Sequence, residues 1–315
     1  MANLNKEFGL FNIDLGITAT KKRHLQDSKE YLRDVIRSYF KKNHNEYEPM
    51  FYTQGSWKMK TVIRTKDDTC DIDDGVYFPR NPANVSACTL QSWVKKAVEN
   101  VTDSKVQHRK KCITVDYQAG YNIDLPVYLF NKDVDTHPYI AVKESGWSED
   151  DPKEMVKTFA AAKKDNGDQL VRVVKYLKAW CDYKREKMPS GLAMTILVMN
   201  NYEANKRDDI SLKYTLISIQ SALIANFSCI VPATPNDDIF SDYDEAKKKN
   251  FLSNLDGIIA DARKAVDEEN NRKTASVLWQ KHLGQRFPDG EDITETDIAR
   301  SAITPIIGNS KPYAK

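Results

Sequence analysis

The sequence predicts an α+β fold whose first half mixes strands with helices and whose second half is almost entirely helical. Segments with the two-residue alternation of half-buried strands occur only before about Asp150. A long, charged stretch with helical spacing precedes them, and helical spacing alone follows them. We therefore expect two domains, residues 1–150 and 151–315, joined through the polar and charged region 146–168.

In the first half, the spacing of apolar residues changes along the chain between helical and strand periods. This change separates two expected helices from four expected strands. The apolar residues Leu25, Leu32 and Phe40 recur at helical spacing within the first helix. Pro126 cannot donate a hydrogen bond, so its strand should be an edge strand or contain a bulge there. The expected helices cover about 20–42 and 90–100, and the expected strands cover 51–54, 71–78, 112–118 and 121–130, the last two joined by a turn at 119–120.

In the second half, apolar stripes and capping residues mark five helices. The first carries a stripe from Leu170 to Cys181, and the second begins after Ser190 as its N-cap. The others are expected at 212–227, at 243–269 with Ser241 as cap, and at 275–283, where Gly284 and Pro288 end the helix.

Composition indicates a globular protein of the reducing cytosol. The chain has 315 residues, of which 41% are hydrophobic and 29% charged, and its net charge is only +2. The three basic clusters at 21–23, 108–111 and 247–249 are typical of solvated helix faces, so the charge does not point to nucleic acid. None of the five cysteines forms a C-x-x-C pair, which argues against a zinc ribbon or a disulfide framework. The N-terminus has no apolar signal region, and the longest apolar run, 192–199, is too short for a membrane span. We expect a cytoplasmic protein.

Paired carboxylates on the second strand suggest phosphate chemistry. Side chains two apart on a strand lie on the same face, so Asp71 and Asp73 should repel each other unless a cation sits between them. The preceding Gly55-Ser56 turn can hold a phosphate through backbone N–H groups and a hydroxyl. Asp124 lies alone in an apolar strand, where an unpaired charge is costly to bury, and it is the best candidate for a third carboxylate. Together these residues predict a magnesium site facing a nucleoside triphosphate.

Each of these signals has an ordinary alternative. An Asp-x-Asp pair is common on exposed strands, Gly-Ser is a common turn, and Asp74-Gly75 could end the strand and leave Asp71 and Asp73 in a loop. What favours catalysis is the order of the three segments: a strand into Gly-Ser, a strand with Asp-x-Asp, and an apolar strand with one Asp.

The motifs, taken together, resemble a known family. Gly55-Ser56, Asp-Ile-Asp-Asp-Gly-Val-Tyr at 71–77 and Ile-Asp-Leu-Pro-Val-Tyr at 123–128 resemble the nucleotidyltransferases of the DNA polymerase β superfamily. The closest likeness is to the bacterial cGAS/DncV-like enzymes, the CD-NTases, and within them to the dinucleotide cyclases. The resemblance implies a polymerase-β-like palm domain with the long N-terminal helix, followed by a helical domain that closes the nucleotide cleft.

The resemblance also assigns two residues of the second half to the triphosphate. Lys178, two residues before Trp180, matches the family's phosphate-binding lysine, and Ser190 matches a serine at the start of the next helix. From the sequence alone, Lys178 could equally be a surface partner of Asp182, one turn away. Ser190 is a helix N-cap in either case, which is compatible with an anion at the helix N-terminus.

The resemblance implies an activity and partners. Such enzymes use two Mg²⁺ ions, with Mn²⁺ possible, to join ATP, GTP or other NTPs into a cyclic di- or trinucleotide with release of pyrophosphate. The product is a second messenger that activates a separate effector protein in anti-phage signalling, and regulatory proteins can take part. Asp71, Asp73 and Asp124 would hold the metals, and Ser56 and Lys178 the triphosphate.

Departures from the family's wider pattern limit what carries over. The chain has no His/Cys cluster of the kind that animal relatives use to sense DNA through zinc, so DNA sensing by that route is not expected. The tail at 311–315 does not end in glycine, and conjugation of the C-terminus to other proteins stays open.

Other functions remain open at this point. A non-cyclising nucleotidyltransferase could modify an RNA end, a protein or a small molecule, and an inactive module could bind nucleotide alone. A structural interaction protein with solvated acidic residues would show no magnesium-dependent nucleotide binding. Tyr117, Tyr121 and Tyr202 could stack on bases, although packing explains each equally simply.

Overall fold

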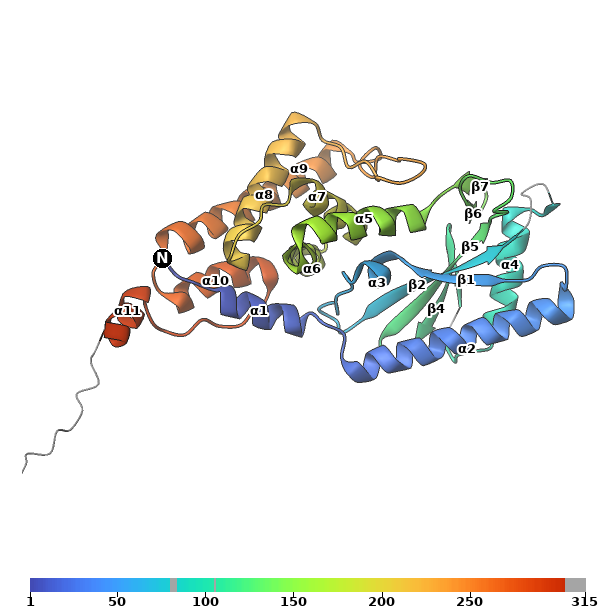
Figure 1. Cartoon of the computed structure of the whole chain (residues 1–315), viewed down its shortest axis with the longest axis horizontal. Helices are drawn as coiled ribbons and strands as arrows, with labels where there is room; N and C mark the ends of the chain where they lie inside the picture. Colours follow the sequence, from blue (N-terminus) through green and yellow to red (C-terminus); the bar gives the residue numbers. More distant parts are fainter. Residues whose placement is uncertain (80–83, 105, 304–315) are drawn as a thin grey trace, which may run out of the picture.

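The computed structural model describes residues 1–79, 84–104 and 106–303, and these residues form the expected α+β fold. A mixed sheet lies at one end and a group of helices at the other (Figure 1). The strands are β1 (Met50–Gln54), β2 (Cys70–Phe78), β3 (Gln107–His108), β4 (Cys112–Tyr117), β5 (Tyr121–Leu129), β6 (Tyr139–Val142) and β7 (Gly146–Glu149). The helices of the first half are α1 (Asn5–Asp14), α2 (Ala19–Asn43), α3 (Gly55–Met59) and α4 (Ala87–Val98).

The sheet places β2 and β5 side by side at its centre. The strand order is β1-β2-β5-β4-β3, with β6 also pairing with β5, and the β2–β5 pair is parallel while the others are antiparallel. The register sets Asp73 opposite Asp124. Pro126 therefore lies in a central strand, and its expected place in an edge strand is wrong. The pairs between β2 and β5 run to Asp124 and resume at Val127, so the ladder accommodates the missing N–H there.

One face of the sheet is covered by α2 and α4 (Figure 1). Thr18 caps α2, and a stripe that includes Leu25 and Phe40 packs on the sheet without any exposure. Arg33 of the same helix binds the fully buried Asp74 through two contacts, Nε to Oδ2 at 2.7 Å and Nη2 to Oδ1 at 2.6 Å. The opposite face of the sheet carries the candidate site described below.

The second half is helical, as expected, around a core that includes Trp180, Phe251 and Trp279. Asp244 rather than Ser241 caps the helix that begins at Glu245, since its side chain accepts from the Lys247 N–H. The region 146–168, expected as a polar boundary, contains β7 and a helix. The elements are α5 (Pro152–Asn166), α6 (Asp168–Lys184), α7 (Gly191–Asn201), α8 (Asp208–Ala225), α9 (Glu245–Arg263), the π-helix η2 (Lys264–Glu268), α10 (Arg272–Leu283) and α11 (Glu295–Ile303).

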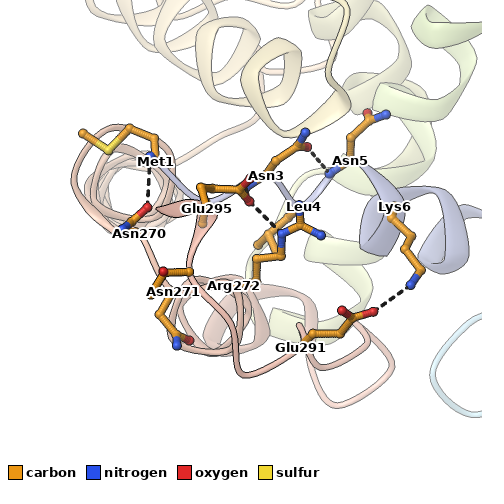
Figure 2. A network of polar contacts seen from close by, with 12 residues as sticks. Met1, Asn3, Leu4, Asn5, Lys6, Asn270, Asn271, Arg272, Glu291 and Glu295 are labelled. Atoms are coloured by element: carbon orange, nitrogen blue, oxygen red, sulfur yellow. Dashed lines mark hydrogen bonds and ion pairs between the residues drawn. The ribbon is translucent and has the colours of Figure 1, made fainter. Parts of the chain in front are cut away.

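The N-terminal segment packs with the helices of the second half rather than with the sheet. Phe8 and Phe11 of α1 are buried in the helical core. Ahead of them, the buried Ala2 donates its N–H to the Glu269 carbonyl. The Asn3 N–H donates to Glu295, whose carboxylate also accepts from Arg272 (Figure 2). A division of the chain at residue 150 remains a proposal, because by packing residues 2–15 belong to the helical part.

The tail at 311–315 lies outside the residues that the structure describes. None of the helices in the described ranges is both long enough and apolar enough to span a membrane.

Candidate active site

A cavity of about 600 Å³ opens between the uncovered face of the sheet and the first helices of the second half. Its volume is in the usual range of small-molecule sites. The lining brings together residues that lie far apart in the chain. They are Gly55, Ser56, Asp71, Asp73 and Lys178, with Thr61, Val62, Ile63 and Thr65 from the loop after α3 and Met188, Pro189, Gly191, Leu192 and Thr195 from around the start of α7.

Asp71 and Asp73 form the acidic floor of this cavity. Both project from one face of β2, as strand alternation requires, while Ile72 and Asp74 between and beside them are buried on the other face. Asp71 is exposed through the cavity and Asp73 is half-buried. The alternative in which Asp74-Gly75 ends the strand is wrong, since β2 continues to Phe78.

The surrounding cavity walls and the repulsion between neighbouring carboxylates raise the pKa of both residues. Loss of hydration, then the charges of Asp71 and Asp124, raise the pKa of Asp73 to about 7. The pKa of Asp71 is also raised, by loss of hydration first and by Asp124 second. Asp124 is thus electrostatically part of the group, although it does not line the cavity. Thr114 of the neighbouring strand donates to its Oδ1 and orients it.

The donor set fits a hard divalent cation. Three neighbouring carboxylates carry negative charge that the nearby Lys178 offsets only in part, and hard cations prefer such oxygen ligands. Among the described residues, however, the one group whose ligand atoms all lie within 4.8 Å of one another is elsewhere, at His137, Asp151 and Glu154. Wider spacing at the acidic floor is what repulsion between uncompensated carboxylates would produce.

Gly55 and Ser56 begin the short helix α3 rather than forming a free turn. Gly55 has φ +59°, which favours glycine. A Cβ built on it would lie 3.0 Å from Asp73 Cγ and closer still to Oδ2, so a side chain at this position would displace the carboxylate. Glycine is therefore required here both by the backbone conformation and by the proximity of Asp73.

Lys178 is buried in the wall of the cavity. Only 9% of it is exposed, and its Nζ donates to the Thr61 carbonyl at 3.2 Å and to Thr61 Oγ1 at 3.1 Å. The alternative of a surface partner for Asp182 is therefore wrong. Burial lowers the pKa of Lys178 to about 8, although Asp71 and Asp73 act to raise it. The ammonium is poised between the acidic floor and the loop after α3.

Ser190 is the N-cap of α7, with its Oγ accepting from the Ala193 N–H at 3.2 Å. It does not line the cavity, but its neighbours Pro189 and Gly191 do. A Cβ on Gly191 would lie 3.3 Å from Lys178 Cε, so the helix start packs directly against the lysine stem. The structure thus places Ser190 beside the cavity and leaves its role in phosphate binding as a proposal.

Two further polar residues of the cavity wall had no signal in the sequence. Arg185 and Asp182 line the cavity, and Arg185 pairs with Asp182 and with Asp67 of the loop before β2. The Lys66 N–H also donates to Asp182. These contacts join the end of α6 to the irregular loop before β2, which is why no pattern in the sequence indicated them.

A second cavity of about 290 Å³ lies against the other side of the acidic floor. The two cavities share Gly55, Met59, Asp73 and Leu192. The second cavity adds Lys111, Cys112, Pro126, Tyr128 and Asp150, among others.

A buried chain of hydrogen bonds links the start of α3 to this second cavity. Tyr77 donates to Gln54 at 3.1 Å, Gln54 to Tyr128 at 3.1 Å, and Tyr128 to Asp150 at 2.9 Å. Because Gln54 immediately precedes Gly55, this chain fixes the segment shared by both cavities.

The tyrosines suggested as base-stacking residues pack elsewhere. Tyr117 and Tyr121 stack on each other at 4.8 Å between ring centroids, and Tyr121 shares a hydrogen bond with Ser28 of α2. Tyr202 donates to Gln169 in the helical half. None of the three lines the two cavities described here.

Comparison with known proteins finds a family that is similar to the segment containing most of the sheet. Residues 49–128, which contain Gly55, Ser56 and all three acidic residues, match the family described as cyclic GMP-AMP synthase DncV-like, nucleotidyltransferase domain. A cyclic GMP-AMP synthase of Escherichia albertii is 29% identical over 206 residues, which cover 60% of this chain and 44% of that protein. The match thus spans less than half the length of this curated relative.

Solved structures show the same fold over nearly the whole chain. Vibrio cholerae DncV, a cyclic AMP-GMP synthase, in complex with nonhydrolyzable GTP gives a TM-score of 0.81 at 18% identity, covering 93% of this chain and 98% of the other. Escherichia coli DncV in its 3′-deoxy GTP bound form gives 0.78 at 20% identity, covering 90% and 97%. The likeness to bacterial cGAS/DncV-like enzymes indicated by the motifs is therefore confirmed.

Proposed function

Starting from its place among the bacterial cGAS/DncV-like nucleotidyltransferases, we propose that this protein joins nucleoside triphosphates into a cyclic di- or trinucleotide. The observation that carries the proposal is the pair of cavities that meet at Asp73. A polymerising reaction needs one place for the triphosphate that is attacked and another for the nucleotide whose hydroxyl attacks it. Two cavities on either side of one carboxylate supply both.

In the proposed arrangement the larger cavity holds the donor triphosphate. The N–H groups at the start of α3, the Ser56 hydroxyl and Lys178 would bind its phosphates, with Ser190 and the N-terminus of α7 close by. Lys178 would exchange its contacts with Thr61 for phosphate oxygens. Phosphate binding would also raise the pKa of the lysine and keep it charged.

Asp71, Asp73 and Asp124 would hold divalent cations, which we propose to be two Mg²⁺ ions, with Mn²⁺ as a substitute. The ions would neutralise charge on the phosphates and make the attacking hydroxyl more acidic. The carboxylates themselves fix where these charges sit, because Asp73 is held against Gly55 and Asp124 is oriented by Thr114.

The proposed reaction is an in-line displacement at the α-phosphorus. A 3′-hydroxyl oxygen of the acceptor bonds to this phosphorus while the bond to the β-phosphate bridging oxygen breaks, and pyrophosphate leaves. The hydroxyl proton passes to solvent or to one of the three carboxylates, of which Asp73 lines both cavities. A second displacement, in which the new linear product supplies both groups, closes the ring.

We propose ATP and GTP as the substrates, since relatives of the same fold are described with these nucleotides. By the same analogy, the product would be a second messenger that activates a separate effector in anti-phage defence in the cytoplasm. No membrane partner and no zinc-dependent DNA sensing enter this proposal.

The proposal is tested by incubating the protein with all four labelled NTPs and Mg²⁺, followed by phosphatase and mass analysis. Phosphatase-resistant material of cyclic mass is expected from the wild-type protein and not from Asp71→Asn/Asp73→Asn. Linear products alone would indicate a non-cyclising transferase. Nucleotide binding without any product would indicate an inactive binding module, and either result would overturn the proposal of a cyclase.

A further inference from the structure

A cluster of three potential metal ligands lies outside the acidic floor, at the junction of three separate segments. His137 comes from the loop between β5 and β6, and Asp151 and Glu154 come from the start of α5. Their ligand atoms all lie within 4.8 Å of one another, and all three residues are half-buried. Thr234, from the loop after α8, forms hydrogen bonds with all three of these residues.

Hydrogen bonds alone do not explain the position of the His137 imidazole. Its Nδ1 lies 3.4 Å from Asp151 Oδ2, and its Nε2 lies 3.4 Å from Thr234 Oγ1. Both separations exceed the usual range for N–H···O bonds. Two ligands each about 2.0 Å from a tetrahedral Zn²⁺ lie roughly 3.3 Å apart, so the spacing of Nδ1 and Oδ2 is that of neighbouring ligands on one ion.

Neither carboxylate of the cluster forms an ion pair with a lysine or arginine of the described residues, although Lys157 acts electrostatically on Glu154. The ammonium of the adjacent Lys153 instead lies over the rings of Tyr52 and Tyr77, at 4.6 and 4.9 Å from their centroids. Two carboxylates and an imidazole that face one another form a donor set that one divalent ion can bind.

In both carboxylates, one of the two oxygens is held by backbone N–H groups. Asp151 Oδ1 accepts from the N–H groups of Lys153 and Glu154, at 3.0 and 3.1 Å, which leaves Oδ2 toward the cluster. Glu154 Oε2 accepts from the Thr234 N–H at 2.8 Å, which leaves Oε1. Metal-binding side chains are typically oriented by such outer hydrogen bonds.

We propose that His137, Asp151 and Glu154 bind one divalent transition-metal ion of the Zn²⁺ type, with water completing the coordination. The ion joins the β5–β6 loop to the start of α5, and through Thr234 it also secures the loop after α8. Asp151 and Thr234 line the second cavity, so the ion stiffens one wall of that cavity without reaching the acidic floor. The site is distinct from the one proposed for Mg²⁺, and its existence does not depend on the proposed activity.

The test uses the full-length chain carrying Asp71→Asn and Asp73→Asn, so that the acidic floor does not contribute. Metal-stripped protein is dialysed against Zn²⁺ and its bound zinc is counted, with a thermal melt in parallel. One Zn²⁺ per chain is expected, together with a melting temperature several degrees higher, and excess Mg²⁺ should not displace it.

Variants in the same background separate this site from adventitious binding. His137→Ala and Glu154→Gln should each weaken Zn²⁺ binding at least tenfold, whereas His24→Ala, at an exposed position on α2, should not. Circular dichroism confirms that each variant folds. Equal zinc binding in the His137→Ala and His24→Ala proteins, or none in their parent, would overturn the proposal.

Discussion

Asp73 and Asp74 are consecutive residues on one strand, yet their carboxylates lie in opposite surroundings. Asp74 is fully buried and satisfied, since it accepts two hydrogen bonds from Arg33 and one from Thr53. Asp73 faces the cavity, and loss of hydration, together with the charges of Asp71 and Asp124 beside it, raises its pKa to about 7. Charged groups inside proteins are normally paired. The unbalanced charge therefore lies on the face where a ligand can enter, and the balanced charge lies on the face that holds the fold together.

The difference between the two faces of β2 can be tested by replacing the carboxylates of each face in separate variants. Asp71→Asn/Asp73→Asn should lower turnover at least about a thousandfold, because the groups that place the cations are lost. Turnover is measured as pyrophosphate release from NTP and Mg²⁺. Activity within tenfold of wild type would remove these residues from the metal site.

The same double variant should keep or gain stability in the absence of metal. The folded-state pKa of Asp73 lies above its unfolded value of 3.8, so ionisation of this group costs folding free energy. This cost is absent below about pH 4 and complete above about pH 7. Chemical denaturation at pH 8 without divalent ions should thus favour the variant, and the difference should vanish toward pH 4.

The matched substitution on the other face should act on stability instead. Asp74→Asn leaves Arg33 without its carboxylate and should cost about 3 kcal/mol of unfolding free energy. Where the variant remains folded, its KM for NTP should stay within about twofold of the wild-type value. A large loss of activity in fully folded Asp74→Asn protein would contradict the division of the strand into two faces.

A smaller loss of turnover is expected when a side chain is added next to the acidic floor while the charge of the floor stays the same. Gly55→Ala places a methyl group against Asp73 and should lower kcat about a hundredfold. Gly146→Ala is the control, because Gly146 also has a positive φ, of 89°, but no atom lies within 4 Å of the added Cβ. Both variants should lose about 1 kcal/mol of stability. Equal activity in the two would show that only backbone strain matters at Gly55.

Removing the buried ammonium should weaken nucleotide binding. Lys178→Ala should raise the KM for NTP about thirtyfold, since a charge-assisted contact to phosphate is lost. Lys175→Ala, on the same helix but outside the cavity lining, should change KM by less than threefold. Steady-state kinetics measures both. An unchanged KM in Lys178→Ala would exclude this residue from the phosphate site.

The mildest perturbation is a change of pH. Because the pKa of Asp73 is about 7, a divalent ion must displace a proton below that pH. Mn²⁺ affinity, followed by calorimetry, should fall about tenfold per pH unit from pH 7 to pH 5.5 and level off above pH 7. A flat profile over this range would mean that no raised carboxylate takes part in binding the ion.

The sequence predicted the acidic floor because the positions of Asp71 and Asp73 depend on the spacing of residues within one strand. Strand alternation places Asp71 and Asp73 on one face from their spacing alone, and the register that brings Asp124 beside Asp73 needs only two adjacent parallel strands. The resemblance supplied Lys178, whose burial no local pattern distinguishes from a surface position. These predictions relied on regular geometry or on family likeness.

What the sequence did not predict depends on contacts between distant segments. The tie of Lys178 to Thr61 joins a helix to an irregular loop, and the packing of α1 against the helical half joins the two ends of the described chain. Pro126 was misplaced because a local rule about missing donors cannot show that strands flank it on both sides. Tertiary context, rather than propensity, decided each of these cases.

The most direct test of the central claim is a crystal structure of the protein with a nonhydrolysable NTP and Mn²⁺, in which anomalous scattering locates the metal. Anomalous peaks are expected next to Asp71 and Asp73, with the phosphates between these residues and Lys178. A well-ordered nucleotide whose metal lies away from Asp71 and Asp73, or whose phosphates lie outside the cavity, would contradict the claim.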